Sequence, residues 1–230
     1  MTRRTNARIA GVMFLLYIAA GVASMILFGQ ATGGEGTAAR LASIARHATT
    51  VRMTAVLEML MFLCAVLLAV TLYALTREVD RDLALVALCC RVSEGVIGAV
   101  STVRTLGLVA VATAFGTAAS PDAAAAEALG ALLLKMGGLT MVISATCFAV
   151  GSTIYAYLFL RGRGIPVPLA WLGLFASILL VVLLPLQLAG LIEGAVTGYM
   201  WIPMAVFEVT LALWLIIKGV ATPPAIRAQA

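Results

Sequence analysis

The sequence predicts an all-α membrane protein, a polytopic bundle of six transmembrane helices that forms a single domain over residues 1–230. Hydrophobic residues make up 63% of the chain and charged residues only 11%, with a mean hydropathy of +1.11. A soluble domain has about 25% charged residues, so a surface with so few would not stay in water. The apolar runs approach the roughly 20 residues that a helix needs to cross a bilayer, whereas the strands of a membrane barrel would alternate over segments of about ten.

The first span follows a basic leader and carries no charge. Arg3, Arg4 and Arg8 precede an apolar run from about residue 9 to 28. A secretory signal peptide would have a shorter apolar core and a small-residue cleavage site, so we expect this helix to be retained. The other spans are expected at about residues 53–76, 83–115, 129–160, 169–192 and 200–220.

Polar segments separate these spans. Residues 37–51 predict an interfacial amphipathic connector with an apolar face and a basic face. The apolar face holds Leu41, Ile44, Ala48 and Val51, and the basic face holds Arg40, Arg46 and His47. A polar hairpin is expected at residues 77–82, and a loop is expected to hold Pro121, Asp122 and Glu127.

Prolines mark the fifth span. Pro168 suits the first turn of a helix, where its missing N–H is not needed. Pro185 lies inside the apolar run and predicts a kink or an interruption within one turn, because it removes a hydrogen bond and its ring clashes with the preceding turn. Pro223 and Pro224 open a short tail.

The distribution of basic residues predicts that both termini are cytoplasmic. With the N-terminus inside, nine Lys and Arg residues fall in inner segments and three in outer ones. Cytoplasmic loops carry the excess of basic residues in membrane proteins. The three outer arginines are Arg40, Arg46 and Arg52, on or beside the connector, where long side chains can reach the headgroups.

Seven polar residues within the spans are candidates for an ion or substrate site, because a charge in hydrocarbon needs a partner or a wet cavity. They are Glu58, Arg91, Glu94, Ser101, Arg104, Lys135 and Glu208. A rise of about 1.5 Å per residue places Glu94 near mid-membrane, with Arg91 one turn nearer the cytoplasm. The same estimate groups Glu58, Arg104, Lys135 and Glu208 in the outer half. We expect these four to converge at the mouth of a cavity whose floor is Ser101 and Glu94; isolated salt bridges that hold helices together are the alternative.

Two polar stripes predict that the third and fourth spans are neighbours. Residues spaced by three and four lie on one face of a helix, and small or hydroxyl residues let membrane helices approach closely. The stripes are Arg91, Glu94, Gly98, Ser101 and Thr105 on the third span, and Gly137, Thr140, Ser144, Cys147 and Gly151 on the fourth. Helix packing and a cavity wall are both open interpretations of these stripes.

A short internal similarity links the second and sixth spans. Residues 55–58, Ala-Val-Leu-Glu, resemble residues 205–208, Ala-Val-Phe-Glu. If the hairpins are copies, Glu58 and Glu208 would lie at matching heights and face Arg104 and Lys135. Transporters bind substrates at such repeat interfaces.

The order of several local motifs resembles a bacterial membrane family known as domain of unknown function 4386. The resemblance covers nearly the whole chain. It rests on residues 8–11, Arg-Ile-Ala-Gly; 72–75, Leu-Tyr-Ala-Leu; 91–94, Arg-Val-Ser-Glu; 168–173, Pro-Leu-Ala-Trp-Leu-Gly; and Glu208 with 213–219, Leu-Trp-Leu-Ile-Ile-Lys-Gly. It implies a six-helix membrane fold in the bacterial cytoplasmic (inner) membrane, and it implies no established activity.

The sequence offers little for metal, cofactor or nucleophilic chemistry. A zinc site needs several converging Cys, His or carboxylate ligands, and His47 is the only histidine. Cys64, Cys89, Cys90 and Cys147 lie in apolar runs and are expected to be small buried residues. We expect no catalytic residue, metal or cofactor and no nucleic-acid partner.

Three functions remain open. The first is a non-catalytic membrane module with buried ion pairs that associates with membrane lipid, with another membrane protein or with a second copy of itself. The alternative is a small transporter or channel-like protein that uses Glu58, Glu94 and Glu208 for a small polar or lipidic ligand. The third, an intramembrane lipid-modifying enzyme, has the least support. The first two functions differ in what surrounds the carboxylates: they line a water-filled cavity in a transporter and lie in dry ion pairs in a non-catalytic module.

Overall fold

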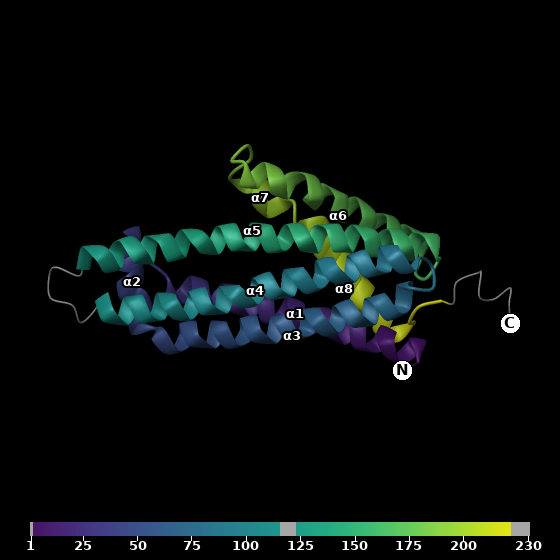
Figure 1. Ribbon diagram of the computed structural model, residues 1–230, viewed down its shortest axis with the longest axis horizontal. Coiled ribbons are helices and arrows are strands. Elements are labelled where there is room, and N and C mark those ends of the chain that lie inside the picture. Colours follow the sequence, from purple (N-terminus) through teal and green to yellow (C-terminus); the bar gives the residue numbers. More distant parts are fainter. Residues whose placement is uncertain (1, 116–122, 222–230) are drawn as a thin grey trace. The chain divides into compact units, whose positions relative to one another are not determined.

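The computed structural model describes residues 2–115 and 123–221, and these residues form eight helices and no strand (Figure 1). The helices are α1 Arg3–Ala31, α2 Gly36–Arg46, α3 Ala48–Thr76, α4 Arg81–Phe115, α5 Ala123–Arg161, α6 Val167–Leu188, α7 Ala195–Tyr199 and α8 Ile202–Ile217. Five of them, together with the segment Ala195–Ile217 that holds α7 and α8, are long and apolar enough to cross a membrane. The predicted all-helical architecture with six membrane spans is confirmed.

Three helices begin five or six residues before the hydropathy pattern predicts, and the first is α1, which starts at Arg3 instead of residue 9. α3 starts at Ala48 instead of residue 53, and α5 starts at Ala123 instead of residue 129. Glu127, which we expected in a loop, therefore lies in the second turn of α5. Arg and Glu interrupt an apolar run but are good helix formers, so a charge marks the end of the hydrophobic segment and not the end of the helix.

The predicted interruption near Pro185 occurs on its C-terminal side. α6 continues through Pro185 and ends at Leu188. Gly190 has a left-handed φ of 71°, a conformation that glycine adopts without a steric penalty. The N–H groups of Gly190 and Leu191 donate to the carbonyls of Gln187 and Leu186, at 3.0 and 2.9 Å. This is a Schellman motif, which ends the helix before the predicted residue 192.

Four predictions are not tested by the described residues: the loop at residues 121–122, the tail from residue 223, the orientation of the termini and the single domain. The loop residues Pro121 and Asp122 and the tail from Pro223 lie outside the described residues. The cytoplasmic orientation of both termini and the assignment of the chain to one domain stay predictions.

The helices form two compact units, which are described separately. Unit 1 comprises the described parts of Met1–Leu16, Leu63–Gly95 and Val142–Ala230, and unit 2 comprises Tyr17–Phe62 and Val96–Met141. Unit 1 contains all of α6, α7 and α8, and unit 2 contains all of α2. α1, α3, α4 and α5 each contribute one part to each unit.

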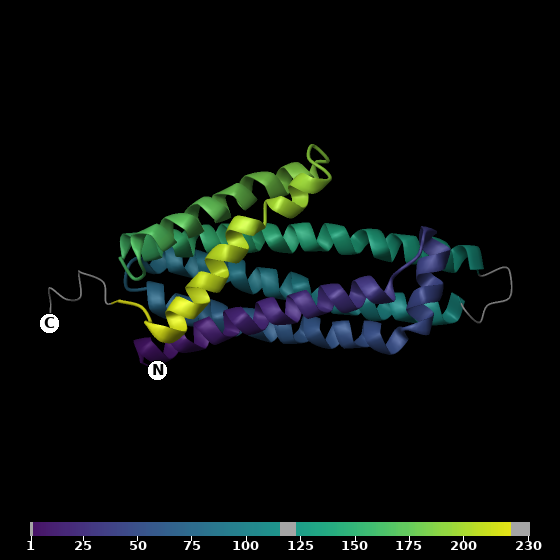
Figure 2. The same cartoon turned by 180° about the vertical axis from the view of Figure 1, so that it is seen from behind.

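The core of unit 1 is built around α8, which can be followed in Figure 2 from α7 toward the start of α1. α8 packs against α6. A Cβ atom on Gly173 of α6 would overlap the ring of Phe207. On the α1 side, a Cβ atom on Gly11 would lie 2.6 Å from the carbonyl oxygen of Ala212. Glycine at both positions therefore allows α8 to approach its neighbours closely.

The core of unit 2 includes the connector helix. The predicted amphipathic helix is α2, and its side chains Leu41 and Ile44 are fully buried. Leu41 packs on Gly130 of α5, while Arg40 and Arg46 are exposed. The connector is shorter than predicted, because the last part of its expected apolar face, including the fully buried Val51, already belongs to α3.

Most side chains of the spans face outward. Between 17 and 39% of the most apolar window of each span is buried inside the protein. The outward residues include many large apolar side chains, such as Val103, Met141 and Phe175, which are more than 60% exposed. Such a surface is compatible with lipid and not with water.

Candidate functional site

The polar stripes of α4 and α5 meet, as predicted. In unit 1, the hydroxyl of Ser144 donates to the carbonyl oxygen of Glu94 at 3.0 Å. About two turns further along α5, a Cβ atom on Gly151 would lie 3.1 Å from Cβ of Cys90 and 3.3 Å from Cγ of Arg91. The absence of a side chain at Gly151 therefore gives the stem of Arg91 room between the two helices.

Arg91 and Glu94 form a buried ion pair on α4. The Nη1 atom of Arg91 lies 2.9 Å from Oε2 of Glu94, and the two side chains are 1% and 3% exposed. The guanidinium carbon of Arg91 also lies 4.8 Å from the ring centroid of Phe148 on α5. A cation over an aromatic face is attracted by the ring, more strongly where water is excluded. The ion pair and the ring together hold this arginine in the interior of unit 1.

Glu208 of α8 faces the same cluster. It interacts electrostatically with Arg91 and Glu94, and together with Arg91 it lines a cavity of about 10 Å³. The other lining residues are Phe14, Leu72, Ser152, Tyr155, Ala156, Phe159, Phe207 and Leu211. A volume of about 10–15 Å³ accommodates about one water molecule. The space is therefore large enough for a water-sized species and too small for an organic substrate.

The aromatic residue Tyr155 closes one side of this cavity. Its hydroxyl is buried and donates to the carbonyl oxygen of Ala69 on α3, at 3.2 Å. This bond ties α5 to α3 and occupies the phenolic proton. We call Arg91, Glu94 and Glu208, with the cavity they border, the inner charge cluster.

A second polar group lies in unit 2. The hydroxyl of Thr105 on α4 donates to Oε1 of Glu58 on α3 at 3.2 Å, and Nη2 of Arg104 donates to that hydroxyl at 3.4 Å. The fully buried Thr105 thus relays the contact between a carboxylate and a guanidinium. Among the described residues no ion pair within 4.0 Å joins Arg104 directly to Glu58.

The guanidinium of Arg104 lies against the backbone of α5. Its Nη1 donates to the carbonyl oxygen of Leu133 at 3.3 Å. A Cβ atom on Gly137 would lie 2.7 Å from the same Nη1 atom. Its guanidinium carbon is 6.0 Å from the ring centroid of Phe28. Gly137, which we identified in the polar stripe, therefore provides the surface on which this arginine rests.

The structure divides the predicted group of four outer charges. Glu58 and Arg104 are brought together in unit 2. Lys135 is exposed and forms no ion pair with any described residue. Glu208 belongs to unit 1 and joins Arg91 and Glu94 instead. Ser101 is half-buried in unit 2, and its hydroxyl forms no hydrogen bond with a described side chain or backbone group.

Sequence reasoning missed the residues that complete these sites. Tyr155 and Phe148 are aromatic residues in an apolar helix, and their spacing from Arg91 in the sequence gives no signal of contact. Helical periodicity places Thr105 in a polar stripe but does not reveal its contact with Glu58, which lies on another helix. Among the described residues, no group of three or more His, Cys, Asp or Glu side chains is placed to hold a metal ion.

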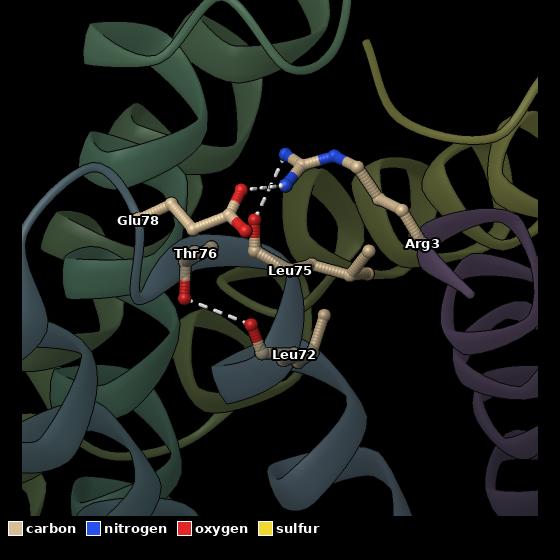
Figure 3. A network of polar contacts seen from close by, with 5 residues as sticks. All are labelled: Arg3, Leu72, Leu75, Thr76 and Glu78. Atoms are coloured by element: carbon tan, nitrogen blue, oxygen red, sulfur yellow. Dashed lines mark hydrogen bonds and ion pairs between the residues drawn. The ribbon is translucent and has the colours of Figure 1, made fainter. Parts of the chain in front are cut away.

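A third feature is a concentration of basic side chains where the helices of unit 1 end. Nη1 of Arg3 lies 2.8 Å from Oε2 of Glu78, and Nη2 donates to the carbonyl oxygen of Leu75 at 3.0 Å (Figure 3). Nη1 of Arg161 lies 3.1 Å from Oδ2 of Asp80. These contacts join the start of α1 and the end of α5 to the turn between α3 and α4.

The end of α8 reaches the same place, because the N–H of Ala221 donates to the carbonyl oxygen of Gly164 at 2.9 Å. We call this region the basic end. Its basic residues are Arg3, Arg4, Arg8, Arg77, Arg81, Arg161, Arg163 and Lys218, and its acidic residues are Glu78, Asp80 and Asp82. All of the basic residues except Arg3 are exposed.

Comparison with known proteins identifies a family and no relative of established activity. Residues 9–219 match the family model described as Domain of unknown function (DUF4386). No curated protein and no solved structure matches the chain.

Proposed function

The chain belongs to the DUF4386 family, and we propose that it is a non-catalytic membrane module whose basic end binds anionic lipid headgroups. In this proposal the buried charges are structural: Arg91 is paired with Glu94 of its own helix and interacts with Phe148 of α5 and Glu208 of α8. Another membrane protein or a second copy of the chain is a further partner that the proposal allows.

The basic end is the observation that supports lipid association. Eight basic residues face three acidic ones there, an excess of five positive charges. The surface of a cytoplasmic leaflet is negatively charged, and each Lys or Arg close to it contributes about 1 kcal/mol of attraction. Arg3 and Arg161 are paired with carboxylates, so the exposed side chains of Arg77, Arg81 and Arg163 are the best placed for phosphate groups.

The inner charge cluster supports the structural role of the buried charges. Arg91 and Glu94 are within ion-pair distance and almost completely buried, and the adjoining cavity of about 10 Å³ has room for little more than one water. A buried pair of this kind is destabilised strongly when one partner is removed. Arg91 and Glu94 can therefore stabilise the packing of unit 1 without binding a substrate.

The same charges suggest an orientation. An excess of basic residues at the basic end favours a cytoplasmic location for it and for both termini. For a bacterial protein this corresponds to a multi-pass protein of the plasma membrane.

Lipid retention tests the proposal. The protein is reconstituted in nanodiscs containing equal parts of phosphatidylglycerol and phosphatidylcholine, extracted in mild detergent, and analysed for retained lipid by native mass spectrometry. We expect enrichment of phosphatidylglycerol, and a loss of most of this enrichment when Arg77, Arg81 and Arg163 are all replaced by Gln.

The matched control replaces Arg40, Arg46 and Arg52 by Gln, which removes the same charge from exposed positions of unit 2. This control is expected to retain phosphatidylglycerol like the wild type. Equal retention of the two lipids by the wild type, or equal losses in both triple variants, contradicts the proposal.

A second candidate function is a small transporter or channel-like protein that uses Glu58, Glu94 and Glu208. The observation that favours it is the position of Glu208, which borders a cavity together with Arg91. Counterflow of ions in proteoliposomes, abolished by Glu208→Gln and retained in Glu127→Gln, would support this function over the first.

A further inference from the structure

The inner charge cluster contains two carboxylates and one guanidinium. Glu94 and Glu208 both face Arg91. An arginine side chain stays protonated at any physiological pH, so it contributes one positive charge. With both carboxylates ionised, the cluster would carry one uncompensated negative charge.

An uncompensated charge is unfavourable in this environment. Arg91 and Glu94 are 1% and 3% exposed, so water screens them little, and Glu208 beside them is half-buried in a membrane-spanning segment. A buried charge without a partner is destabilising even where a neighbouring ion pair is well formed, because desolvation of each ion must be offset by its own partner. The cluster therefore requires one additional positive charge.

The described surroundings do not provide this charge. α5 contributes Tyr155, whose hydroxyl donates to Ala69, and the thiol of Cys147 beside Glu94. α1 and α3 contribute the apolar side chains of Phe14 and Leu72. α6, which packs against α8, has no ionisable residue. Cys90, next to Arg91 on α4, is a thiol that would not add a positive charge in any protonation state.

The volume of the cavity restricts what can supply the charge. About 10 Å³ holds about one water molecule. A sodium or potassium ion would need several oxygen ligands in addition to Glu208, and its approach would be opposed by the guanidinium of Arg91. A proton needs no such shell and is carried on a carboxyl oxygen.

We propose that the inner charge cluster is a proton-binding site, in which Arg91 is paired with Glu94 and one exchangeable proton is bound to a carboxyl oxygen of Glu208. The bound proton forms one O–H bond, breaks none within the protein, and leaves the cluster neutral. The cavity next to Glu208 accommodates the single water through which the proton enters and leaves. The proposal is independent of lipid binding at the basic end.

Infrared spectroscopy of the protein in nanodiscs tests this site. The carbonyl stretch of a neutral carboxylic acid is separate from that of a carboxylate, and we expect it in the wild type near neutral pH. Glu208→Gln is expected to abolish it. The control Glu127→Gln changes an exposed glutamate of α5 and is expected to leave it unchanged.

The variant Glu94→Gln distinguishes charge balance from simple burial. It leaves one carboxylate for one guanidinium, so Glu208 ionises as the partner of Arg91 and the neutral-acid band is lost. If burial alone kept Glu208 neutral, the band would remain in Glu94→Gln, and the proposal would be wrong.

Absence of the band from the wild type, or its persistence in Glu208→Gln, would also overturn the proposal. Because the first measurement uses the unmodified protein, the test does not depend on the folding of any variant. Helix content measured by circular dichroism identifies a variant that has lost its structure, and for such a variant the wild-type band alone decides.

Discussion

Arg91 and Glu94 lie one turn apart on α4, and the Nη1 and Oε2 atoms of their almost completely buried side chains are separated by 2.9 Å. This pair is formed within a single helix, so it does not by itself join two helices. Its connections to the rest of unit 1 come from Phe148 of α5 and Glu208 of α8. The buried guanidinium of Arg91 on α4 thus interacts with residues of α5 and α8, so its removal affects the packing of all three helices.

Removal of the cation should destabilise unit 1 strongly. Arg91→Leu removes the cation beside the buried Glu94 and the half-buried Glu208, and we expect a loss of about 3–5 kcal/mol in the free energy of unfolding. Glu94→Gln should have a smaller effect, because Glu208 remains as a partner for Arg91. Reversible unfolding in mixed detergent micelles measures both. Equal stability of Arg91→Leu and the wild type would show that the pair does not hold the fold.

The hydroxyl of Thr105 should contribute more to stability than the branched shape of its side chain. Thr105→Val keeps the branched side chain and removes the relay between Glu58 and Arg104, which leaves buried polar groups unsatisfied and should cost about 1–3 kcal/mol. Thr105→Ser retains the hydroxyl and should cost less. The comparison is made by thermal unfolding of both variants. A Ser variant less stable than the Val variant would contradict the relay.

Close packing of α1 and α8 should make Gly11 intolerant of a side chain. A Cβ atom there would lie 2.6 Å from the carbonyl oxygen of Ala212, and overpacking of this kind typically costs about 1–3 kcal/mol. The control is Gly138→Ala on α5, where a Cβ atom meets no atom within 4 Å. Removing a glycine from an exposed helix position should stabilise by about 0.5–1 kcal/mol. Opposite changes in unfolding temperature for the two variants are the expected result.

The orientation of the chain should be readable from cysteine accessibility. In a variant without native cysteines, Glu193→Cys, in the turn after α6, should react with a membrane-impermeant thiol reagent added outside cells. Asp80→Cys, at the basic end, should react only after the membrane is opened. The reverse pattern of labelling would place the basic end outside and would contradict the positive-inside assignment.

The features that depend on one helix at a time could be predicted from the sequence. Span positions follow from runs of apolar residues, and the facing stripes of α4 and α5 follow from helical periodicity. The ends of helices were less predictable: Glu127 marks the end of an apolar run and yet lies within α5. Hydropathy measures the environment that a segment prefers, whereas helix boundaries depend on backbone hydrogen bonds and caps.

The site depends on relations between helices, and there the prediction was partial. A depth estimate from the helical rise contains no information about the direction in which a side chain points. It therefore grouped Glu208 with Glu58 and Arg104, while the structure places Glu208 beside Arg91. The two glutamates of the similar segments 55–58 and 205–208 nevertheless have similar surroundings. Glu58 lies near Arg104 and Glu208 lies near Arg91, and both arginines belong to α4.

The contact between Gly11 and Ala212 also bears on how the protein is made. A ribosome delivers α1 to the membrane long before α8, so the surface of α1 at Gly11 gains its contact with Ala212 only after α8 has been inserted. Contacts between residues so distant in sequence form late and are reached through partly assembled intermediates. Quality-control proteases and insertion chaperones would therefore encounter unit 1 with α1 and α6 still lacking the helix that joins them.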